Sequence, residues 1–156
     1  MRVEKDYEEF LGLLNKYQVK YCIVGSYAVA VWGYPRYTKD IDILIEPTRK
    51  NAKRIISAIR EFGIKSQDLT EEDFIKKNRV IQLGYEPVRI DILTSVEGVS
   101  FSTVWKNRIE EFYGKEKVYF IGLKELIKIK KKVARPQDLA DLEELLRRER
   151  WRRRKK

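Results

Sequence analysis

The chain has 156 residues, of which 43% are hydrophobic and 12% aromatic, so it suits one folded domain and excludes a disordered chain. It contains no histidine, which excludes histidine triads, histidine zinc sites and histidine general bases. The net charge is +10, and residues 147–156 contribute eight basic and one acidic side chain, a net +7. This basic end on a nearly neutral body favours an anionic partner, most simply nucleic acid, with a solvated charged tail as the alternative.

We expect a cytoplasmic protein with no membrane segment. The first ten residues, MRVEKDYEEF, have mixed charge and lack the apolar run of a secretory signal. The most apolar stretch, IVGSYAVAVW, is too short to span a bilayer. The single cysteine, Cys22, excludes an intramolecular disulfide and is typical of a reducing compartment.

The periodicity of the first half predicts helices and strands in alternation. In chain order these are an amphipathic helix at residues 7–17, a strand at 19–25, a short apolar helix at 26–32, a loop at 33–40, a second strand at 40–46 and a longer helix at 47–63. In the second half, Thr70 and Asp73 resemble a capping box before a short helix. The residues after it predict strands at 79–83 and 88–94 joined as a hairpin, a helix at 100–112, a short strand at 117–121 and a helix at 123–133. Pro136 suits the first turn of a last helix, in which the apolar stripe would comprise Leu139, Leu142, Leu145 and Leu146.

These elements predict an α+β fold, a small mixed β-sheet flanked by helices with further helices at the C-terminal end. We expect a core over residues 1–122, C-terminal helices over 123–148 packed on that core, and a basic tail over 149–156.

Two aspartates interrupt the apolar strand DIDILIE. Side chains in a strand alternate faces, so Asp40 and Asp42 share one face while the isoleucines point into the core. Asp91 repeats the arrangement in RIDIL. Converging carboxylates repel one another unless a cation lies between them, and oxygen ligands without His or Cys favour Mg²⁺ or Mn²⁺. The alternative is that the acids are caps, edge residues or partners of nearby cations, namely Arg36, Lys39 and Arg89.

The Gly25-Ser26 pair lies where a strand turns into a helix. Glycine permits a close backbone approach, and the free N–H groups at the start of a helix attract phosphate. Taken alone, Ser26 is more often an ordinary N-cap. The chain has no other glycine-rich phosphate motif.

Together these features resemble the DNA polymerase β-like nucleotidyltransferase superfamily. Its signature is an apolar strand ending in Gly-Gly or Gly-Ser, about a dozen residues, D-x-D, and a third acid on a later strand. This chain has IVGS, thirteen residues, DID and then RIDIL. The resemblance implies a two-metal site for Mg²⁺ or Mn²⁺ at Asp40, Asp42 and Asp91, with an NTP as the substrate.

Much of the rest, from about residue 20 to about residue 146, resembles the AbiEii-like branch of small nucleotidyltransferases. The loop GYPRYTKDID is similar to that branch's Gly-x-x-Arg-x-Thr-x-Asp-h-Asp run, where h is an apolar residue. LIKIKKKVARPQDLADLEEL is similar to its C-terminal pattern, a Lys followed by Arg-x-x-Asp-h-x-Asp-Leu. The resemblance implies catalytic roles for Lys130 and Asp138, although Lys128, Lys131 and Lys132 are competing lysines. It also implies a nucleotide-facing rim and a triphosphate contact that involve Gly25, Ser26, Arg36, Thr38 and Lys39.

The implied activity is transfer of a nucleoside monophosphate to a hydroxyl of an RNA end (tRNA included), a protein side chain or a small molecule. The same resemblance implies a possible place in a toxin–antitoxin or phage-defence system. Two alternatives stay open: an antitoxin that modifies a partner toxin, and a noncatalytic nucleic-acid-binding domain that retains the fold.

Overall fold

The structure is a computed structural model that describes residues 2–33, 38–64, 68–85 and 87–155. Its strands are β1 Tyr21–Val24, β2 Asp40–Ile45, β3 Val80–Tyr85, β4 Val88–Leu93, β5 Ile109–Tyr113 and β6 Glu116–Phe120. Its helices are α1 Lys5–Lys16, α2 Gly25–Trp32, α3 Arg49–Phe62, α4 Phe101–Lys106, α5 Leu123–Val133 and α6 Pro136–Lys155, with a 3₁₀ helix at Glu71–Phe74. The predicted α+β fold is confirmed.

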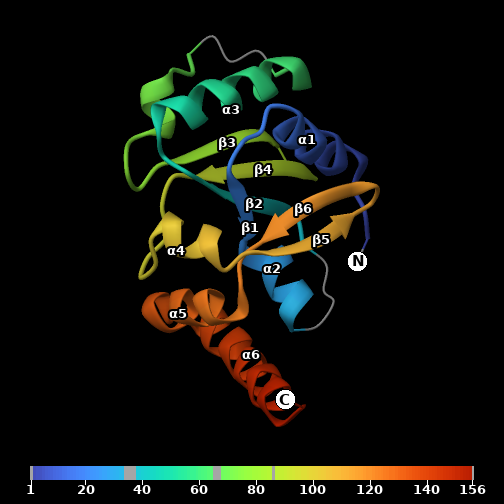
Figure 1. Ribbon diagram of the computed structural model, residues 1–156, viewed down its shortest axis with the longest axis vertical. Helices are drawn as coiled ribbons and strands as arrows, with labels where there is room; N and C mark the ends of the chain where they lie inside the picture. The colour runs from blue at the N-terminus through green and yellow to red at the C-terminus, as the bar shows by residue number, and fades with distance from the viewer. Residues whose placement is uncertain (1, 34–37, 65–67, 86, 156) are drawn as a thin grey trace.

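One mixed sheet runs through the molecule in the order β3-β4-β2-β1-β6-β5. The central pair β1 and β2 is antiparallel, whereas β2 pairs with β4 and β1 pairs with β6 in parallel. Antiparallel hairpins, β3 with β4 and β5 with β6, close the two edges. Figure 1 shows α1 and α3 side by side at one end of the molecule and α2, α5 and α6 at the other.

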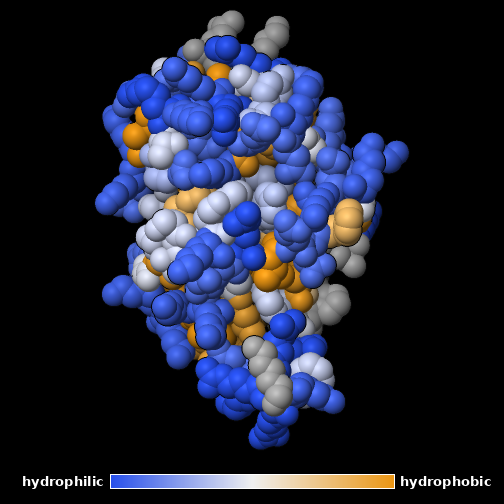
Figure 2. Space-filling view, in the orientation of Figure 1, coloured by the Kyte–Doolittle hydropathy of each residue, from blue (hydrophilic) through white to orange (hydrophobic). Residues whose placement is uncertain are grey.

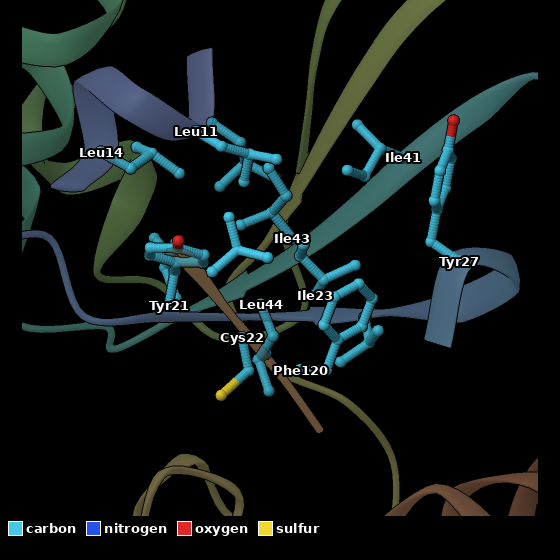
Figure 3. Close-up of a cluster of buried hydrophobic side chains, with 14 of the residues drawn as sticks. Leu11, Leu14, Tyr21, Cys22, Ile23, Tyr27, Ile41, Ile43, Leu44 and Phe120 are labelled. Carbon is cyan, nitrogen blue, oxygen red and sulfur yellow. The ribbon is translucent and has the colours of Figure 1, made fainter. Parts of the chain in front are cut away.

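The core lies between α1, α3 and the central strands. Ile41 and Ile43 of β2 are buried as expected, and Figure 3 shows Ile43 beside Leu11 and Leu14 of α1. Burying such a side chain contributes about 1.5–3 kcal/mol, so this face of β2 fixes the strand in the sheet. The opposite face of β2 is therefore held in a defined place, and that face carries the aspartates.

Local signals set the ends of the helices where the sequence indicated. Thr48 caps α3 by accepting a hydrogen bond from the backbone N–H of Asn51, and Gly63 ends α3 in the left-handed conformation with φ +97°. The predicted capping box of Thr70 and Asp73 is present and starts the 3₁₀ helix.

The helix predicted over residues 100–112 is wrong in its second half. The helix α4 ends at Lys106, and residues 109–113 form β5, which pairs with β6 along its whole length. Aromatic residues at helical spacing suggested one long helix, but Ile109, Phe112 and Tyr113 are also strand formers. A turn at Gly114 with φ +60° lets this segment fold back as a hairpin.

The apolar stripe expected along the last helix is also partly wrong. Leu139 is 52% exposed, and the fully buried positions of α6 are Asp138, Asp141 and Leu145. Two acids therefore share the buried face that the leucines alone were expected to form, because α5 supplies a buried cation opposite them. The helix α6 runs without a break to Lys155, through most of the segment suggested as a basic tail.

Candidate active site

Three carboxylates meet on the face of the sheet opposite the α1 side. Asp42 on β2 is the direct register partner of Asp91 on β4. Asp40 lies two residues before Asp42, on the same face of β2. One carboxylate oxygen from each residue lies within 4.8 Å of the other two. Asp91 is buried, and Asp40 and Asp42 are partly exposed. The three acids named from the sequence are thus brought together at one point.

Gly25 stands against this cluster. The register partner of Asp42 on β1 is Val24, so the chain turns from β1 into α2 directly beside the Asp42 carboxylate. Gly25 has φ +68°, and a Cβ atom at this position would overlap the Asp42 carboxyl group. Only glycine allows both this backbone conformation and this close approach. Val24 occupies the N-cap position of α2, so Ser26 lies within the first turn and is not the N-cap.

The environment of the cluster shifts the pKa of Asp42. The pKa of Asp42 is raised to about 7, chiefly by burial and in addition by the nearby carboxylates of Asp40 and Asp91, against the opposing effect of Arg89 and Lys130. A carboxyl group in this state gains from any cation that enters the cluster. The electrostatics therefore favour binding of a cation.

Arg89 forms an ion pair with Asp91, which lies two residues further along the same strand, β4. Its Nε donates to Oδ1 of Asp91 at 3.0 Å and its Nη2 to Oδ2 at 2.8 Å, a bidentate pair. The ion-pair alternative considered for the acids thus describes Asp91 in part. A bidentate guanidinium fixes the orientation of this buried carboxylate.

A second ionic cluster closes the other side of the site. Lys130 of α5 is buried, and its Nζ donates to Oδ1 of Asp138 at 2.9 Å and to Oδ2 of Asp141 at 3.2 Å, both on α6. Burial alone would raise the pKa of Asp138, but hydrogen bonds from Arg135 and Lys130 outweigh it and lower that pKa to about 2. The competing lysines are all exposed, namely Lys128, Lys131 and Lys132.

A cleft of about 570 Å³ joins the two clusters. Its walls contain Gly25 and Ser26 at the start of α2, Asp40 and Asp42 on β2, and the Lys130 group from the C-terminal helices. Such a volume is in the range of small-molecule sites. Further lining comes from Val24, Leu93, Val96, Leu126, Ile129, Val133, Arg135, Gln137, Asp138 and Asp141.

The rim residues inferred from the loop are less closely connected with this cleft. Arg36 lies outside the described residues. Thr38 is half-buried and Lys39 is exposed, and among the described residues neither belongs to the lining of the cleft. The backbone carbonyl of Lys39 is held by the hydroxyl of Tyr7, 3.1 Å away.

Sequence reasoning missed two residues that shape the site. Tyr7 of α1 places its hydroxyl 2.9 Å from the carbonyl of Arg89 and so ties the starts of β2 and β4 together, and burial raises its pKa to about 12. Its helical spacing marked it only as core. Asp141 shares Lys130 with Asp138, and its spacing of three residues from Asp138 on one helix was the available signal.

The acidic cluster fits a divalent metal. All three candidate ligands are carboxylates, the donors that Mg²⁺ and Mn²⁺ prefer, and their oxygens converge without His or Cys. Asp40, Asp42 and Asp91 are therefore the residues that could hold such an ion.

A comparison with protein families agrees with this geometry, as described below. No curated protein matches the chain. None of the helices in the described ranges is long and apolar enough to cross a membrane. A family model matches residues 1–150, nearly the whole chain, and its description is nucleotidyltransferase of unknown function. The chain therefore belongs to this nucleotidyltransferase family, DUF6036.

Proposed function

We propose that this protein is a metal-dependent nucleotidyltransferase that moves a nucleoside monophosphate from an NTP to a hydroxyl acceptor. The single observation that carries the proposal is the convergence of Asp40, Asp42 and Asp91 beside Gly25, where Asp40 and Asp42 line a cleft large enough for a nucleotide. Family membership supports the same reaction class.

The reaction joins the acceptor oxygen to the α-phosphorus of the NTP. The bond between the α-phosphorus and the oxygen that bridges to the β-phosphate breaks, and pyrophosphate leaves with that oxygen. Asp40 and Asp42 would hold both metal ions, and Asp91 would hold one of them and accept the proton of the hydroxyl. Divalent ions at this site would supply charge neutralisation for the triphosphate and activation of the hydroxyl.

Other residues of the cleft have distinct roles in this proposal. Gly25 and Ser26 would bind the triphosphate through backbone N–H groups at the start of α2. Arg89 would orient Asp91 and release at least one of its oxygens when Asp91 acts, because Arg89 now contacts both. Lys130, held by Asp138 and Asp141, would supply positive charge on the α5 side.

A screen with labelled nucleotides tests the proposal. The protein is incubated with Mg²⁺, total RNA or cell lysate, and each of the four NTPs labelled at the α-phosphate. We expect label in a macromolecule or small acceptor with at least one NTP, and none with Asp42→Asn. Absence of transfer, together with absence of Mg²⁺-dependent NTP binding by calorimetry, would contradict the proposal.

A further inference from the structure

The helix α6 connects the cleft to the basic end of the chain. Its first two turns carry Asp138 and Asp141, which line the cleft, and the same helix continues through Lys155. From Asp141 to Trp151 the helix advances roughly 15 Å at 1.5 Å per residue. Figure 1 shows α6 projecting away from the sheet toward the C-terminus. Whatever binds the end of α6 therefore lies at a fixed distance from the cleft.

One face of this end combines positive charge with an exposed aromatic ring. Its residues follow the helical spacing i, i+3, i+4, i+7 and i+8, and we call them the basic face: Arg147, Arg150, Trp151, Arg154 and Lys155. Trp151 is 57% exposed, and the Nζ of Lys155 lies 5.4 Å from the centre of its ring. A solvent-exposed indole among cations is typical of surfaces on which nucleic-acid bases stack.

Two arginines of the basic face are free of carboxylate partners. Within the described part of the chain, Arg150 and Arg154 make no ion pair, whereas Arg147 lies 3.1 Å from Glu144. Off this face, Arg148 and Arg153 are also paired, with Glu144 and Glu149. A charge already compensated by a neighbour gains less from a phosphate than an uncompensated one. Among the described residues of the basic face, the charges without an ion pair are therefore those of Arg150, Arg154 and Lys155, and Lys155 already lies against the Trp151 ring.

The opposite face of the helix anchors it to the body. Leu145 is fully buried, and the guanidinium of Arg152 lies 4.4 Å from the centre of the Trp32 ring at the end of α2. Positions 145 and 152 are two turns apart, so both point toward the body and the basic face points to solvent. Figure 2 shows the end of the molecule formed by α6 covered with hydrophilic side chains.

The composition of this end excludes a lipid surface as the natural occupant. A helix that lies in a membrane interface needs a continuous apolar face opposite its charges. Residues 147–155, RRERWRRRK, contain one apolar side chain, Trp151, and it lies among the cations. A polymer that offers both phosphates and unstacked bases fits the surface better.

We propose that the basic face of α6 binds a single-stranded nucleic acid and guides its hydroxyl end into the cleft, so that this strand is the acceptor. The proposal rests on the nucleotidyltransferase function proposed above. The strand's hydroxyl oxygen would form the new bond to the α-phosphorus while pyrophosphate leaves. A stacked strand advances about 3.4 Å per nucleotide, so about four or five nucleotides would span the distance from Asp141 to Trp151.

Binding is measured first, without NTP, by fluorescence anisotropy of a 20-nucleotide single-stranded RNA and of the same sequence in DNA. Arg150→Gln/Arg154→Gln should weaken binding at least fivefold and reduce the slope of log K against log salt by about 1.4, which is 0.7 per lost phosphate contact. Trp151→Ala should weaken binding about tenfold with the slope unchanged, because stacking releases no counterion.

Matched controls remove the same features elsewhere. Lys50→Gln/Lys53→Gln takes two exposed lysines from α3, at the opposite end of the molecule (Figure 1), and should leave both affinity and slope unchanged. Phe112→Ala removes an aromatic side chain that is 72% exposed on β5 and should also have no effect. Equal losses in the controls and the α6 variants would overturn the proposal, because binding would then follow total charge.

A second measurement links the basic face to turnover, with whichever NTP is transferred. Arg150→Gln/Arg154→Gln should lower transfer to a 20-nucleotide acceptor at least fivefold and leave transfer to a dinucleotide within twofold of wild type. Equal losses on both acceptors would overturn the guiding role. Unchanged RNA affinity in the same variant would also overturn it. A variant that loses binding to phosphatidylglycerol vesicles but keeps its RNA affinity would do the same. Missing Mg²⁺-dependent NTP binding would instead refute the nucleotidyltransferase function, since the RNA measurement needs no NTP.

Discussion

At the scale of single residues, the contact between Gly25 and Asp42 determines the shape of the site. We expect Gly25→Ala to abolish Mg²⁺-dependent NTP binding and to destabilise the protein by about 2–3 kcal/mol, because the methyl group meets the Asp42 carboxylate and φ is +68°. Calorimetric titration and urea denaturation measure the two effects.

The matched control is Gly63→Ala. Gly63 also has a positive φ, +97°, but nothing lies within 4 Å of the place that an alanine Cβ would take. Only backbone strain should therefore lower the free energy of unfolding, by about 1 kcal/mol. Equal destabilisation in the two variants, with nucleotide binding retained in both, would show that the close approach to Asp42 has no functional part.

The pKa of Asp42 predicts how stability depends on pH in the metal-free protein. Because the pKa rises from 3.8 to about 7 on folding, the folded state binds more protons, and stability should fall as pH rises from about 4 to above 7. The loss should be on the order of a few kcal/mol, reduced by water in the open cleft. Asp42→Asn should flatten this profile between pH 5 and 8, as followed by thermal unfolding in EDTA.

Mg²⁺ provides the control for this profile. At pH 8 it should raise the unfolding midpoint of the wild type and leave that of Asp42→Asn unchanged, because the ion compensates the charge that the substitution removes. A wild-type midpoint that is constant from pH 5 to 8 in EDTA would contradict the electrostatic description of the cluster.

The sequence was sufficient to identify the aspartates but not their partners. Strand alternation in DIDIL and RIDIL places Asp40, Asp42 and Asp91 on the faces of their strands that are opposite the flanking isoleucines, and that pattern is local. The link from Tyr7 to the starts of β2 and β4 joins residues more than 30 positions apart, so no local pattern encodes it.

At the scale of elements, the Lys130 cluster fastens α5 to α6 beside the cleft. Lys130→Met should destabilise the protein by about 3 kcal/mol, because it removes the buried cation that Asp138 and Asp141 share, and it should lower turnover at least tenfold. Lys128→Met, an exposed position on the same helix, should stay within about 0.5 kcal/mol of wild type. Urea denaturation and single-turnover transfer measure the two effects.

Coupling between the partners distinguishes this cluster from separate surface charges. Lys130→Met/Asp138→Asn should lose less stability than the sum of the single variants, because both remove the same ion pair. Asp138, with its pKa lowered to about 2, contributes stability above its usual value of 3.8 that disappears as pH falls toward 2. Full activity in Lys130→Met with a deficit in Lys128→Met would show that the wrong lysine is assigned to the site.

The elements differ in how well their own sequence predicts them. The ends of α3 follow from Thr48 and Gly63, whose effects are local. The strand β5 could not be separated from a helix by its own residues, because its conformation depends on pairing with β6. The buried acids of α6 likewise depend on a lysine in another helix, so the leucine periodicity did not reveal them.

At the scale of the whole molecule, charge and fold are separable. Deleting residues 150–156 should lower the free energy of unfolding by about 1 kcal/mol or less, since among the residues that the structure describes it removes the contact of Arg152 with Trp32 but no buried side chain. NTP binding should be unchanged and single-stranded RNA binding weakened. A fall of several kcal/mol on urea denaturation would mean that this end of α6 belongs to the folded core.

The arrangement of the strands lay beyond the reach of sequence periodicity. The sequence indicated a small mixed sheet with helices around it, and that is confirmed. The order β3-β4-β2-β1-β6-β5 brings strands together across 40 or more residues, as in the pairing of Asp42 with Asp91, and only the three-dimensional packing selects it.

The measurement that tests nucleotidyl transfer most directly compares two positions of the label in one NTP. The protein is incubated with Mg²⁺, the acceptor fraction and the NTP carrying ³²P at either the α- or the γ-phosphate. We predict that the α-label enters the acceptor, that the γ-label appears only in pyrophosphate, and that Asp42→Asn transfers neither. Transfer of the γ-label to the acceptor, or equal α-label transfer by wild type and Asp42→Asn, would contradict the account.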